Sequence, residues 1–328
     1  MSRFQGGQEQ FGLIFLIGCT ACGKSEVALL LAERLGAEIL SVDSMMIYRG
    51  MDIGTAKPSP QQRRRVPHHL IDVVEPAEPF SVARYVELAD QAIKDIHSRG
   101  KRVVAVGGTA LYIRALTEGL FAGPGADPAL RRRLRDRARR LGSPALHAEL
   151  ARLDPAAAAR IHPNDLRRIE RALEVFHLTG QPISALQQQW DRPQRRYPCR
   201  FVGLRRRRED LNHRINLRVG RMIADGLVEE VRRLLASPGG MGMQARQALG
   251  YAQIVDYLEG RCTLERAIEQ IKIHTRRLAK SQRTWFRRFR DVTWLDLEPD
   301  EPPETTAGRV LSALAAPPEP NPDIAAPD

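Results

Sequence analysis

The sequence has few cysteines and no long apolar run, and each shortage excludes a class of protein. Only four of its 328 residues are cysteine, too few for a disulfide framework in a chain of this length. No apolar run approaches the ~20 residues that a transmembrane helix needs. The N-terminus, MSRFQGGQEQ, lacks the apolar core of a signal peptide. We therefore expect a cytoplasmic protein that does not contact a membrane, folded as one large or two smaller domains.

The middle of the chain is short of acidic residues. Residues 131–290 hold 36 Lys and Arg against 16 Asp and Glu, a balance of +20, whereas the whole chain carries +12. Nearly all of these cations are arginine. Such an excess favours a polyanionic partner, nucleic acid foremost. The alternative is an Arg-rich surface that is merely solvated.

A phosphate-binding loop is the strongest local signal. Residues 18–25 read GCTACGKS, after an apolar run and before a helical pattern, which is the context such a loop requires. Its glycines let backbone N–H groups surround phosphate oxygens, Lys24 adds a charge, and Ser25 offers a ligand for Mg²⁺. The pattern predicts a polyphosphate site without naming the compound. The predicted loop residues are Gly18, Cys19, Thr20, Ala21, Cys22, Gly23, Lys24 and Ser25.

Two of the cysteines, Cys19 and Cys22, form a C-x-x-C inside this loop. A metal or redox function would need further ligands, and the sequence has no second C-x-x-C. We therefore interpret both as small loop side chains, and keep an oxidation-sensitive loop as a hypothesis.

The first ~120 residues alternate strand and helix patterns, which predicts a parallel α/β sheet covered on both faces. Gly18, Asp43 and Thr109 each stand at the carboxyl end of a predicted strand. Ligands of parallel sheets bind at the carboxyl ends of the strands, so we expect these three residues to meet at one crevice. The predicted strands are 11–18, 37–43, 68–74 and 101–109, and the predicted helices are 24–35 and 81–98.

The rest of the chain is mostly helical in pattern. The helix predicted for 210–236 places Arg214, Arg218 and Arg221 on one face, away from its apolar stripe. We also expect helices at 244–258 and 263–289, and strands at 199–205 and 293–297. The composition after Glu298, rich in Pro, Ala and acid, predicts disorder. The predicted organisation is a P-loop α/β core from 11–124 and 199–297, a helical insertion at 125–198, and a disordered tail at 298–328.

Several longer segments are more specific than the phosphate loop. Together with GCTACGKS, the stretch DSMMIYRGMDIGTAKP (43–58) resembles the tRNA dimethylallyltransferases, also called tRNA isopentenyltransferases, of the IPP transferase family. The resemblance continues in PHHLIDV (67–73), VGGTALYIRAL (106–116), DPAAAARIHPNDLRRIERALEVF (154–176), LGYAQI (249–254) and TRRLAKSQRTWFRRF (275–289). It covers roughly residues 12–297. It implies a P-loop NTPase-like sheet with an inserted tRNA-binding helical domain.

The resemblance also implies a reaction: a dimethylallyl group passes from its diphosphate to N6 of adenosine 37, next to the anticodon, in tRNAs that read codons beginning with U. Asp43 matches the general base, Arg218 a second diphosphate clamp, and Thr109 a position near the reacting centre. Mg²⁺ on Ser25 would help to neutralise the diphosphate. The enzyme would act as a monomer on the anticodon stem-loop.

The resemblance implies a set of tRNA contacts as well. They are Asp43, Ser44, Met45, Met46, Arg131, Arg167, Arg168, Ile169, Glu170, Arg171, Gln247, Ala248, Leu249, Gly250, Tyr251, Arg276, Arg277, Lys280, Gln282 and Arg283. Because only 5% of the residues are aromatic, few rings are available to stack on RNA bases. Tyr251 and Trp285 are two candidates, and both could equally be core residues. Arg205 to Arg208 could be a merely solvated strand end.

Some positions depart from the family pattern. Cys19 and Cys22 stand where Pro and Ser are usual, Met46 where Gln is common, and Ser281 where Arg is usual. Three other functions stay open: a small-molecule kinase, an isopentenyltransferase acting on free adenine nucleotides, and an RNA-binding ATPase or chaperone. The kinase would explain the loop but not the basic region, and the free-nucleotide enzyme would not need that region.

Overall fold

The computed structural model describes residues 12–121, 123–187, 195–289 and 291–316. They divide into two compact units: one contains the chain up to Leu116 and from Tyr197 onward, and the other spans Thr117–Arg196. The inserted unit thus begins and ends earlier than the predicted 125–198. The two ends of the insertion pair with each other, because the Arg196 N–H donates to the Thr117 carbonyl (2.8 Å). No helix in the described part of the chain is long and apolar enough to cross a bilayer.

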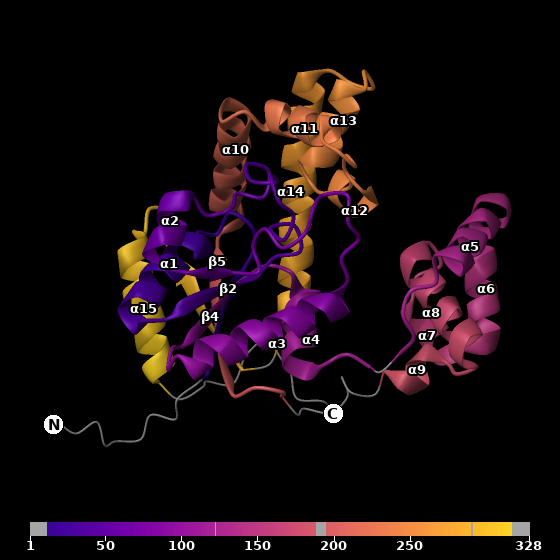
Figure 1. The fold of residues 1–328 in the computed structure, drawn as a ribbon, viewed down its shortest axis with the longest axis horizontal. Coiled ribbons are helices and arrows are strands. Elements are labelled where there is room, and N and C mark those ends of the chain that lie inside the picture. Colours follow the sequence, from indigo (N-terminus) through magenta and orange to yellow (C-terminus); the bar gives the residue numbers. More distant parts are fainter. Residues whose placement is uncertain (1–11, 122, 188–194, 290, 317–328) are drawn as a thin grey trace. The chain divides into compact units, whose positions relative to one another are not determined.

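The first unit is built on a six-stranded parallel sheet, which confirms the predicted α/β class (Figure 1). The strand order is β3-β2-β4-β1-β5-β6. The third strand is much shorter than the predicted 68–74, because Leu70 and Asp72 adopt positive φ angles (60° and 58°) that end the extended backbone. The strands are β1 (Leu13–Gly18), β2 (Glu38–Val42), β3 (His68–His69), β4 (Val103–Gly107), β5 (Cys199–Arg206) and β6 (Val292–Leu297).

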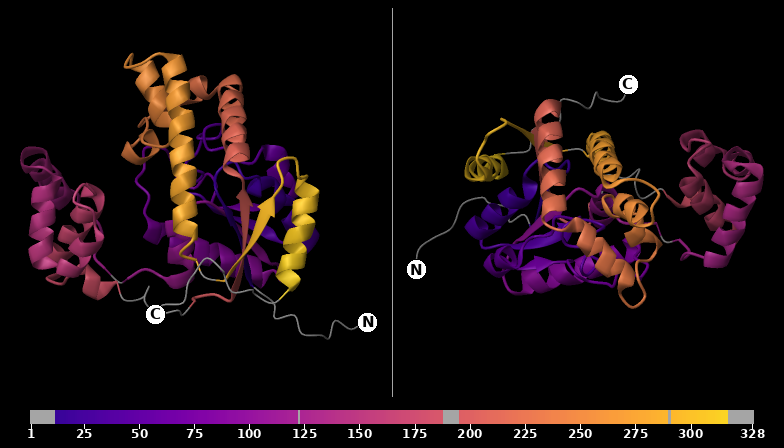
Figure 2. Two further views of the ribbon diagram at one scale, coloured as in Figure 1. Left: turned by 180° about the vertical axis from the view of Figure 1, so that it is seen from behind. Right: turned by 90° about the horizontal axis from the view of Figure 1, so that it is seen from above.

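Helices cover the sheet, and a helical group extends beyond its carboxyl edge, where α10 and α14 pack together (Figures 1 and 2). The single helix predicted at 210–236 is two, because Gly226 (φ 97°) ends the first; Gly250 (φ 92°) likewise divides the helix predicted at 244–258. The helices are α1 (Lys24–Leu35), α2 (Pro60–Arg65), α3 (Val82–Ser98), α4 (Ala110–Glu118), α10 (Arg208–Ala224), α11 (Leu227–Ala236), α12 (Met243–Arg246), α13 (Tyr251–Leu258), α14 (Leu264–Phe286) and α15 (Pro303–Ala315).

Helix α15 contradicts the prediction of a disordered tail from residue 298. It packs on α1 and buries Ala307 and Val310 completely. Glu301 accepts hydrogen bonds from Thr306 (2.8 Å) and Arg309 (2.6 Å) near the start of the helix. The Pro-rich composition concealed a short amphipathic helix that is stable only against a partner. The remainder of the predicted tail, 317–328, lies outside the described residues.

The inserted unit, Thr117–Arg196, is a small helical bundle with a core of its own. Leu134, Leu146, Leu150, Ile169 and Leu173 are all almost fully buried in it. The apolar repeats of its helices therefore account for the fold of this unit. Its helices are α5 (Pro128–Leu141), α6 (Ser143–Leu153), α7 (Pro155–Arg160), α8 (Leu166–Thr179) and α9 (Ile183–Leu186).

A buried carboxylate joins α5 to α8. Glu174 has no exposed side-chain surface and accepts two hydrogen bonds from Arg131 (both 2.8 Å) and one from Arg171 (2.6 Å). Glu170 is held in the same way by Arg135 (2.6 and 2.9 Å). Two of the arginines expected to grip tRNA, Arg131 and Arg171, are therefore engaged inside the unit, and the Glu170 carboxylate faces its core.

Replacing Glu174 with Gln is expected to destabilise the inserted unit by about 3 kcal/mol, the range for breaking a buried ion pair. Desolvation raises the pKa of Glu174, but hydrogen bonds from Arg131 and Arg171 outweigh it, so the pKa is lowered and the group is ionised at neutral pH. The loss of unfolding free energy would be measured by hydrogen exchange of the backbone amides of residues 117–196 at increasing urea concentrations. Asp136→Asn, which breaks an exposed pair with Arg139, is the matched control and should change stability by less than about 0.5 kcal/mol.

Candidate active site

The phosphate loop connects β1 to α1. Within the described residues, no acceptor is found for the backbone N–H groups of Gly23, Lys24 and Ser25, which begin α1. Gly23 has φ 98°, a conformation that few other residues adopt without strain. Together with the helix dipole, these N–H groups form an anion-binding site.

Side chains of the loop itself and of two distant helices, α10 and α14, hold the loop in place. The Lys24 ammonium donates to the Cys19 carbonyl (3.1 Å), and Arg214 donates to the Ala21 carbonyl (3.0 Å). Gln282 of α14 accepts from the Thr20 N–H (2.9 Å) and donates to the Gly108 carbonyl (3.0 Å). The amide of Gln282, one of the residues expected to contact tRNA, joins the phosphate loop to the end of β4.

The two loop cysteines are buried. The Cys19 thiol donates to the Ala279 carbonyl (3.4 Å), and burial raises its pKa to about 11. A protonated, buried thiol is a poor nucleophile and a poor target for oxidants. In the described part of the chain, no group of three or more His, Cys, Asp or Glu could hold a metal ion by itself. These observations favour the interpretation of both cysteines as small loop side chains.

Asp43 and Thr109 lie side by side at the ends of β2 and β4. The Thr109 hydroxyl accepts from the Ser44 N–H (3.1 Å), and the Thr109 N–H donates to the Val42 carbonyl (3.2 Å). One carboxylate oxygen of Asp43 accepts from the N–H groups of Met45 (2.8 Å) and Met46 (3.4 Å). No hydrogen bond to the second oxygen is found within the described residues. Asp43 thus has a fixed orientation and an available lone pair.

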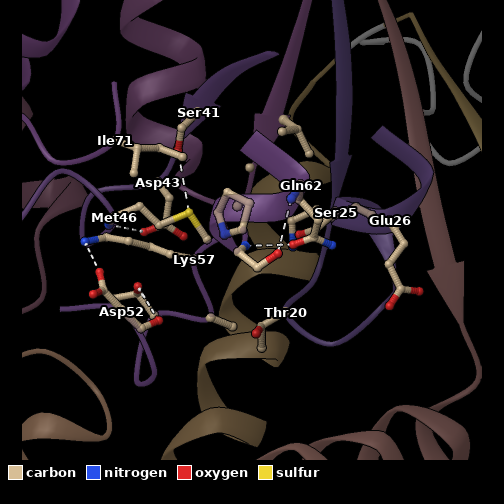
Figure 3. A pocket seen from close by; sticks show the side chains of 18 of the residues that line it. Thr20, Ser25, Glu26, Ser41, Asp43, Met46, Asp52, Lys57, Gln62 and Ile71 are labelled. Carbon is tan, nitrogen blue, oxygen red and sulfur yellow. Dashed lines mark hydrogen bonds and ion pairs between the residues drawn. The ribbon is translucent and has the colours of Figure 1, made fainter. Parts of the chain in front are cut away.

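One pocket of about 930 Å³ is lined by Asp43, by Arg218 and by five residues of the phosphate loop, Thr20, Ala21, Gly23, Lys24 and Ser25. Figure 3 shows Thr20, Ser25 and Asp43 around this pocket. Desolvation lowers the pKa of the partly buried Arg218, while the charge of Asp43 opposes that shift; the guanidinium remains charged at neutral pH. Arg214 and Arg221 line the same pocket, as the spacing on their helix predicted. The strand ends therefore bring together the loop and Asp43, as expected, and α10 adds the cations. Gly18 and Thr109, which were expected at the same crevice, do not line the pocket.

The apolar part of the lining includes two exposed leucines. Leu217 of α10 is 56% exposed and Leu278 of α14 is 41% exposed, and both line the pocket together with Met46 and Ile53. The sequence pattern gave no reason to single out these leucines.

The buried carboxylate of Glu230, on α11, supports residues 52–54, of which Asp52 and Ile53 line the pocket. It accepts from the N–H groups of Asp52 (3.0 Å), Ile53 (2.8 Å) and Gly54 (3.2 Å), and from the Tyr251 hydroxyl (2.6 Å). A Cβ on Gly54 would lie 2.4 Å from the Tyr251 ring, so only glycine fits there. This contact joins the IGTAKP segment to the LGYAQI segment.

The same wall contains a buried lysine. The Lys57 side chain is 1% exposed and donates to the Tyr48 carbonyl and to the carboxylates of Asp52 (2.8 Å) and Asp72 (2.6 Å). Figure 3 shows Lys57 reaching Asp52 beside Asp43 and Met46. Sequence reasoning missed Glu230 because its partners at residues 52–54 lie more than 170 positions away. It missed Lys57 although its partners lie within 15 residues, because no regular pattern marks a lysine that is buried by a turn.

The residues expected to contact tRNA differ in exposure: some are buried, some are exposed and some are partly exposed. Tyr251 is fully buried against Glu230, and Trp285 packs on the core, so the core interpretation holds for Tyr251 and its ring does not offer a stacking platform. The buried members are Ile169, Glu170, Ala248, Gly250 and Tyr251; the exposed members are Arg167, Arg168, Gln247, Arg277, Lys280 and Arg283. Arg276 donates to Asn216 (2.6 Å), and Ser44, Met45, Met46 and Leu249 are partly exposed.

Comparison of the chain with models of known protein families identifies the family to which it belongs. The family model described as IPP transferase matches residues 46–289. The chain belongs to the IPP transferase family. The resemblance found in its motifs is thereby confirmed.

Individual relatives of the IPP transferase family agree along most of the chain. The tRNA dimethylallyltransferase of Geobacter metallireducens is 52% identical over 289 residues, which cover 88% of this chain and 94% of that relative. The tRNA dimethylallyltransferase of Geobacillus thermodenitrificans is 48% identical over 293 residues, or 88% and 91% of the two chains.

Solved structures support the same fold. The full-length tRNA isopentenylpyrophosphate transferase of Bacillus halodurans has a TM-score of 0.66 at 41% identity, covering 93% of this chain and 97% of that one. A eukaryotic dimethylallyltransferase, described as acting on tRNA, has a TM-score of 0.70 at 28% identity, covering 87% and 73%.

Proposed function

We propose that this chain transfers the dimethylallyl group of dimethylallyl diphosphate to N6 of adenosine 37 in tRNAs that read codons beginning with U, giving N6-(dimethylallyl)adenosine and diphosphate. The observation that carries the proposal is one pocket that holds an anion-binding loop, a carboxylate with an available oxygen, and Arg218. An anion site beside a base is what a displacement with a diphosphate leaving group requires. The 48–52% identity to proteins named tRNA dimethylallyltransferase supports the assignment.

In the proposed reaction, the N6 nitrogen attacks the first carbon of the allyl group, and the bond from that carbon to the diphosphate oxygen breaks. Diphosphate leaves with the electron pair. The N–H groups of Gly23, Lys24 and Ser25 bind it, and Lys24 moves from the Cys19 carbonyl to a phosphate oxygen. Arg218 stabilises the charge that develops on the leaving oxygens. The Asp43 carboxylate accepts the proton that N6 loses.

Thr109 is proposed to act by orienting Asp43, since its hydroxyl fixes the Ser44 N–H. The five-carbon tail requires apolar surface, which Leu217, Leu278, Met46 and Ile53 supply within the same pocket.

Magnesium fits this pocket as a companion of the diphosphate. The exposed Ser25 hydroxyl lines the pocket, and Mg²⁺ commonly binds through one or two protein oxygens together with substrate phosphates. When bound, it would supply positive charge to the leaving group, and Ser25 would hold it.

A base inside a tRNA loop must leave its stack to reach such a pocket. Arg277, Lys280 and Arg283 are exposed on α14, the helix that also contributes Leu278 and Gln282 to the pocket. Arg167 and Arg168 are exposed at the start of α8. These five cations are proposed to contact tRNA phosphates, with the protein acting as a monomer in the cytoplasm.

The test is mass spectrometry of nucleosides from unmodified tRNA incubated with the protein, dimethylallyl diphosphate and Mg²⁺. N6-(dimethylallyl)adenosine at position 37 is the expected product, and a tRNA carrying guanosine 37 should give none. Product on AMP or ATP but not on tRNA would assign the free-nucleotide activity instead. Turnover of ATP without any prenylated product would favour a kinase or ATPase.

Affinity for tRNA is expected to fall steeply with salt, because each phosphate contact releases counterions. Five contacts imply about a hundredfold loss or more between about 0.1 and 0.4 M salt. Filter binding across a salt series measures the slope. Arg277→Gln should reduce the slope of log affinity against log salt concentration by about the value of one phosphate contact. A slope near zero in the parent protein would contradict recognition of tRNA through its phosphates.

A further inference from the structure

One arginine outside the proposed reaction is buried against the phosphate loop. The Arg206 side chain, at the end of β5, is 4% exposed. Its Nε donates to the Cys22 carbonyl (3.0 Å), and its Nη1 pairs with Asp210 (3.0 Å). The interpretation of Arg205 to Arg208 as a solvated strand end is therefore wrong for Arg206. Asp210 neutralises the charge of Arg206, so Arg206 acts on the phosphate loop through the geometry of its hydrogen bonds.

The bond to the Cys22 carbonyl fixes the peptide that begins α1. In a planar trans peptide, the C=O of one residue and the N–H of the next point in opposite directions. Because Arg206 holds the Cys22 carbonyl, the Gly23 N–H is directed to the opposite side. That N–H is one of the three for which no acceptor is found within the described residues. Gly23 is flexible by nature, so an external restraint is needed to keep this donor in one direction.

The same guanidinium also reaches the C-terminal segment. Its Nη1 donates to the carbonyls of Glu298 (2.6 Å) and Pro299 (3.0 Å). These residues lead from β6 into α15, which packs on α1, the helix that the phosphate loop begins. The segment lies beyond residues 46–289, which the family model matches. Arg206 and α15 therefore hold the loop and its helix from two sides.

We propose that Arg206 is a positioning residue for the diphosphate: it directs the Gly23 N–H into the anion site and joins the phosphate loop to residues 298–316. The proposal rests on the proposed function, because the loop must bind the donor's diphosphate. Arg206 contacts no reacting atom, so its removal affects the diphosphate and not the tRNA.

The test uses the full-length protein and compares Arg206→Met with Arg205→Met. Arg205 is the preceding residue of the same strand, but it is 42% exposed and pairs with Asp296 at the surface. Calorimetry measures binding of inorganic diphosphate with Mg²⁺, and steady-state kinetics give KM for donor and tRNA. Arg206→Met is expected to weaken diphosphate binding and raise the donor KM about tenfold or more, the effect of one lost charge-assisted hydrogen bond. The tRNA KM should stay within about twofold, and Arg205→Met should match the parent protein.

Arg206→Lys separates geometry from charge and serves as the test if the Met variant fails to fold. A lysine keeps the charge but cannot donate to Cys22, Asp210 and Glu298 from one planar group, so weakened diphosphate binding is again expected. The proposal would be overturned if either Arg206→Met or Arg206→Lys bound diphosphate as tightly as the parent protein. It would also be overturned if the KM for tRNA rose as much as the KM for the donor. If the parent protein itself fails to bind diphosphate, the proposed function fails as well, and this outcome is distinct from the others.

Discussion

Asp43→Asn is expected to lower kcat for tRNA prenylation by about 10³-fold, within the range that a general base contributes. Asparagine keeps an oxygen that can accept from the Met45 and Met46 N–H groups, so the local structure should survive. What it loses is the ability to take the proton from N6. Single-turnover assays with saturating donor would measure the chemical step, and filter binding would show tRNA affinity within a few-fold of the parent protein.

Asp225→Asn is the control for this experiment. Asp225 is exposed and lines the same pocket, and no hydrogen bond to its side chain is found within the described residues, so its removal changes the pocket's charge without removing a positioned base. We expect activity within about threefold of the parent protein. Turnover by Asp43→Asn comparable to that of Asp225→Asn would show that Asp43 does not accept the proton.

Glu230→Gln is expected to destabilise the protein by about 3 kcal/mol, in the range for loss of a buried, fully hydrogen-bonded charge. Four donors converge on this carboxylate. The amide nitrogen of glutamine would face at least one of these donors, leaving both groups without an acceptor. The urea midpoint, with the slope m checked for constancy, measures the loss.

Two further variants make the Glu230 experiment specific. Glu229→Gln alters the neighbouring residue, whose side chain is 69% exposed and pairs with the exposed Arg232, and should cost less than about 0.5 kcal/mol. Tyr251→Phe removes one of the four donors and should cost about 1 kcal/mol. Equal stability of Glu230→Gln and Glu229→Gln would contradict the role of Glu230 as the support of residues 52–54.

Features set by neighbours in the sequence were predictable. The apolar runs in the sequence predicted β1, β2, β4 and β5, and the alternation of strand and helix patterns predicted a parallel sheet. These predictions succeed because the spacing of apolar residues in a strand or a helix is a local property of the sequence. The phosphate loop needs only its own residues and the two elements beside it. Asp43 and Thr109 were predicted to lie near each other because parallel strands share a carboxyl edge, and the Thr109 hydroxyl does contact the residue after Asp43, although Thr109 itself does not line the pocket.

Local patterns failed where a glycine or a distant partner decides the structure. Gly226 and Gly250 split two predicted helices through their backbone conformation, which apolar periodicity does not detect. Helix α15 is too short to be stable alone and depends on α1.

Charged side chains were the hardest to place from the sequence. The sequence around an arginine in a basic segment does not show whether that arginine contacts RNA, as proposed for Arg277, or pairs with a buried carboxylate, as Arg131 does. Likewise, Arg206 meets Cys22 across 184 residues and Gln282 meets Thr20 across 262.

The sequence by itself determined the parallel α/β sheet, the phosphate loop and the family, since these depend on short-range spacing of residue types. Only the tertiary structure decided which polar side chains face the pocket and which support it from behind. The reason is that a buried charge must find its partners wherever the fold brings them, and sequence distance carries no information about that choice.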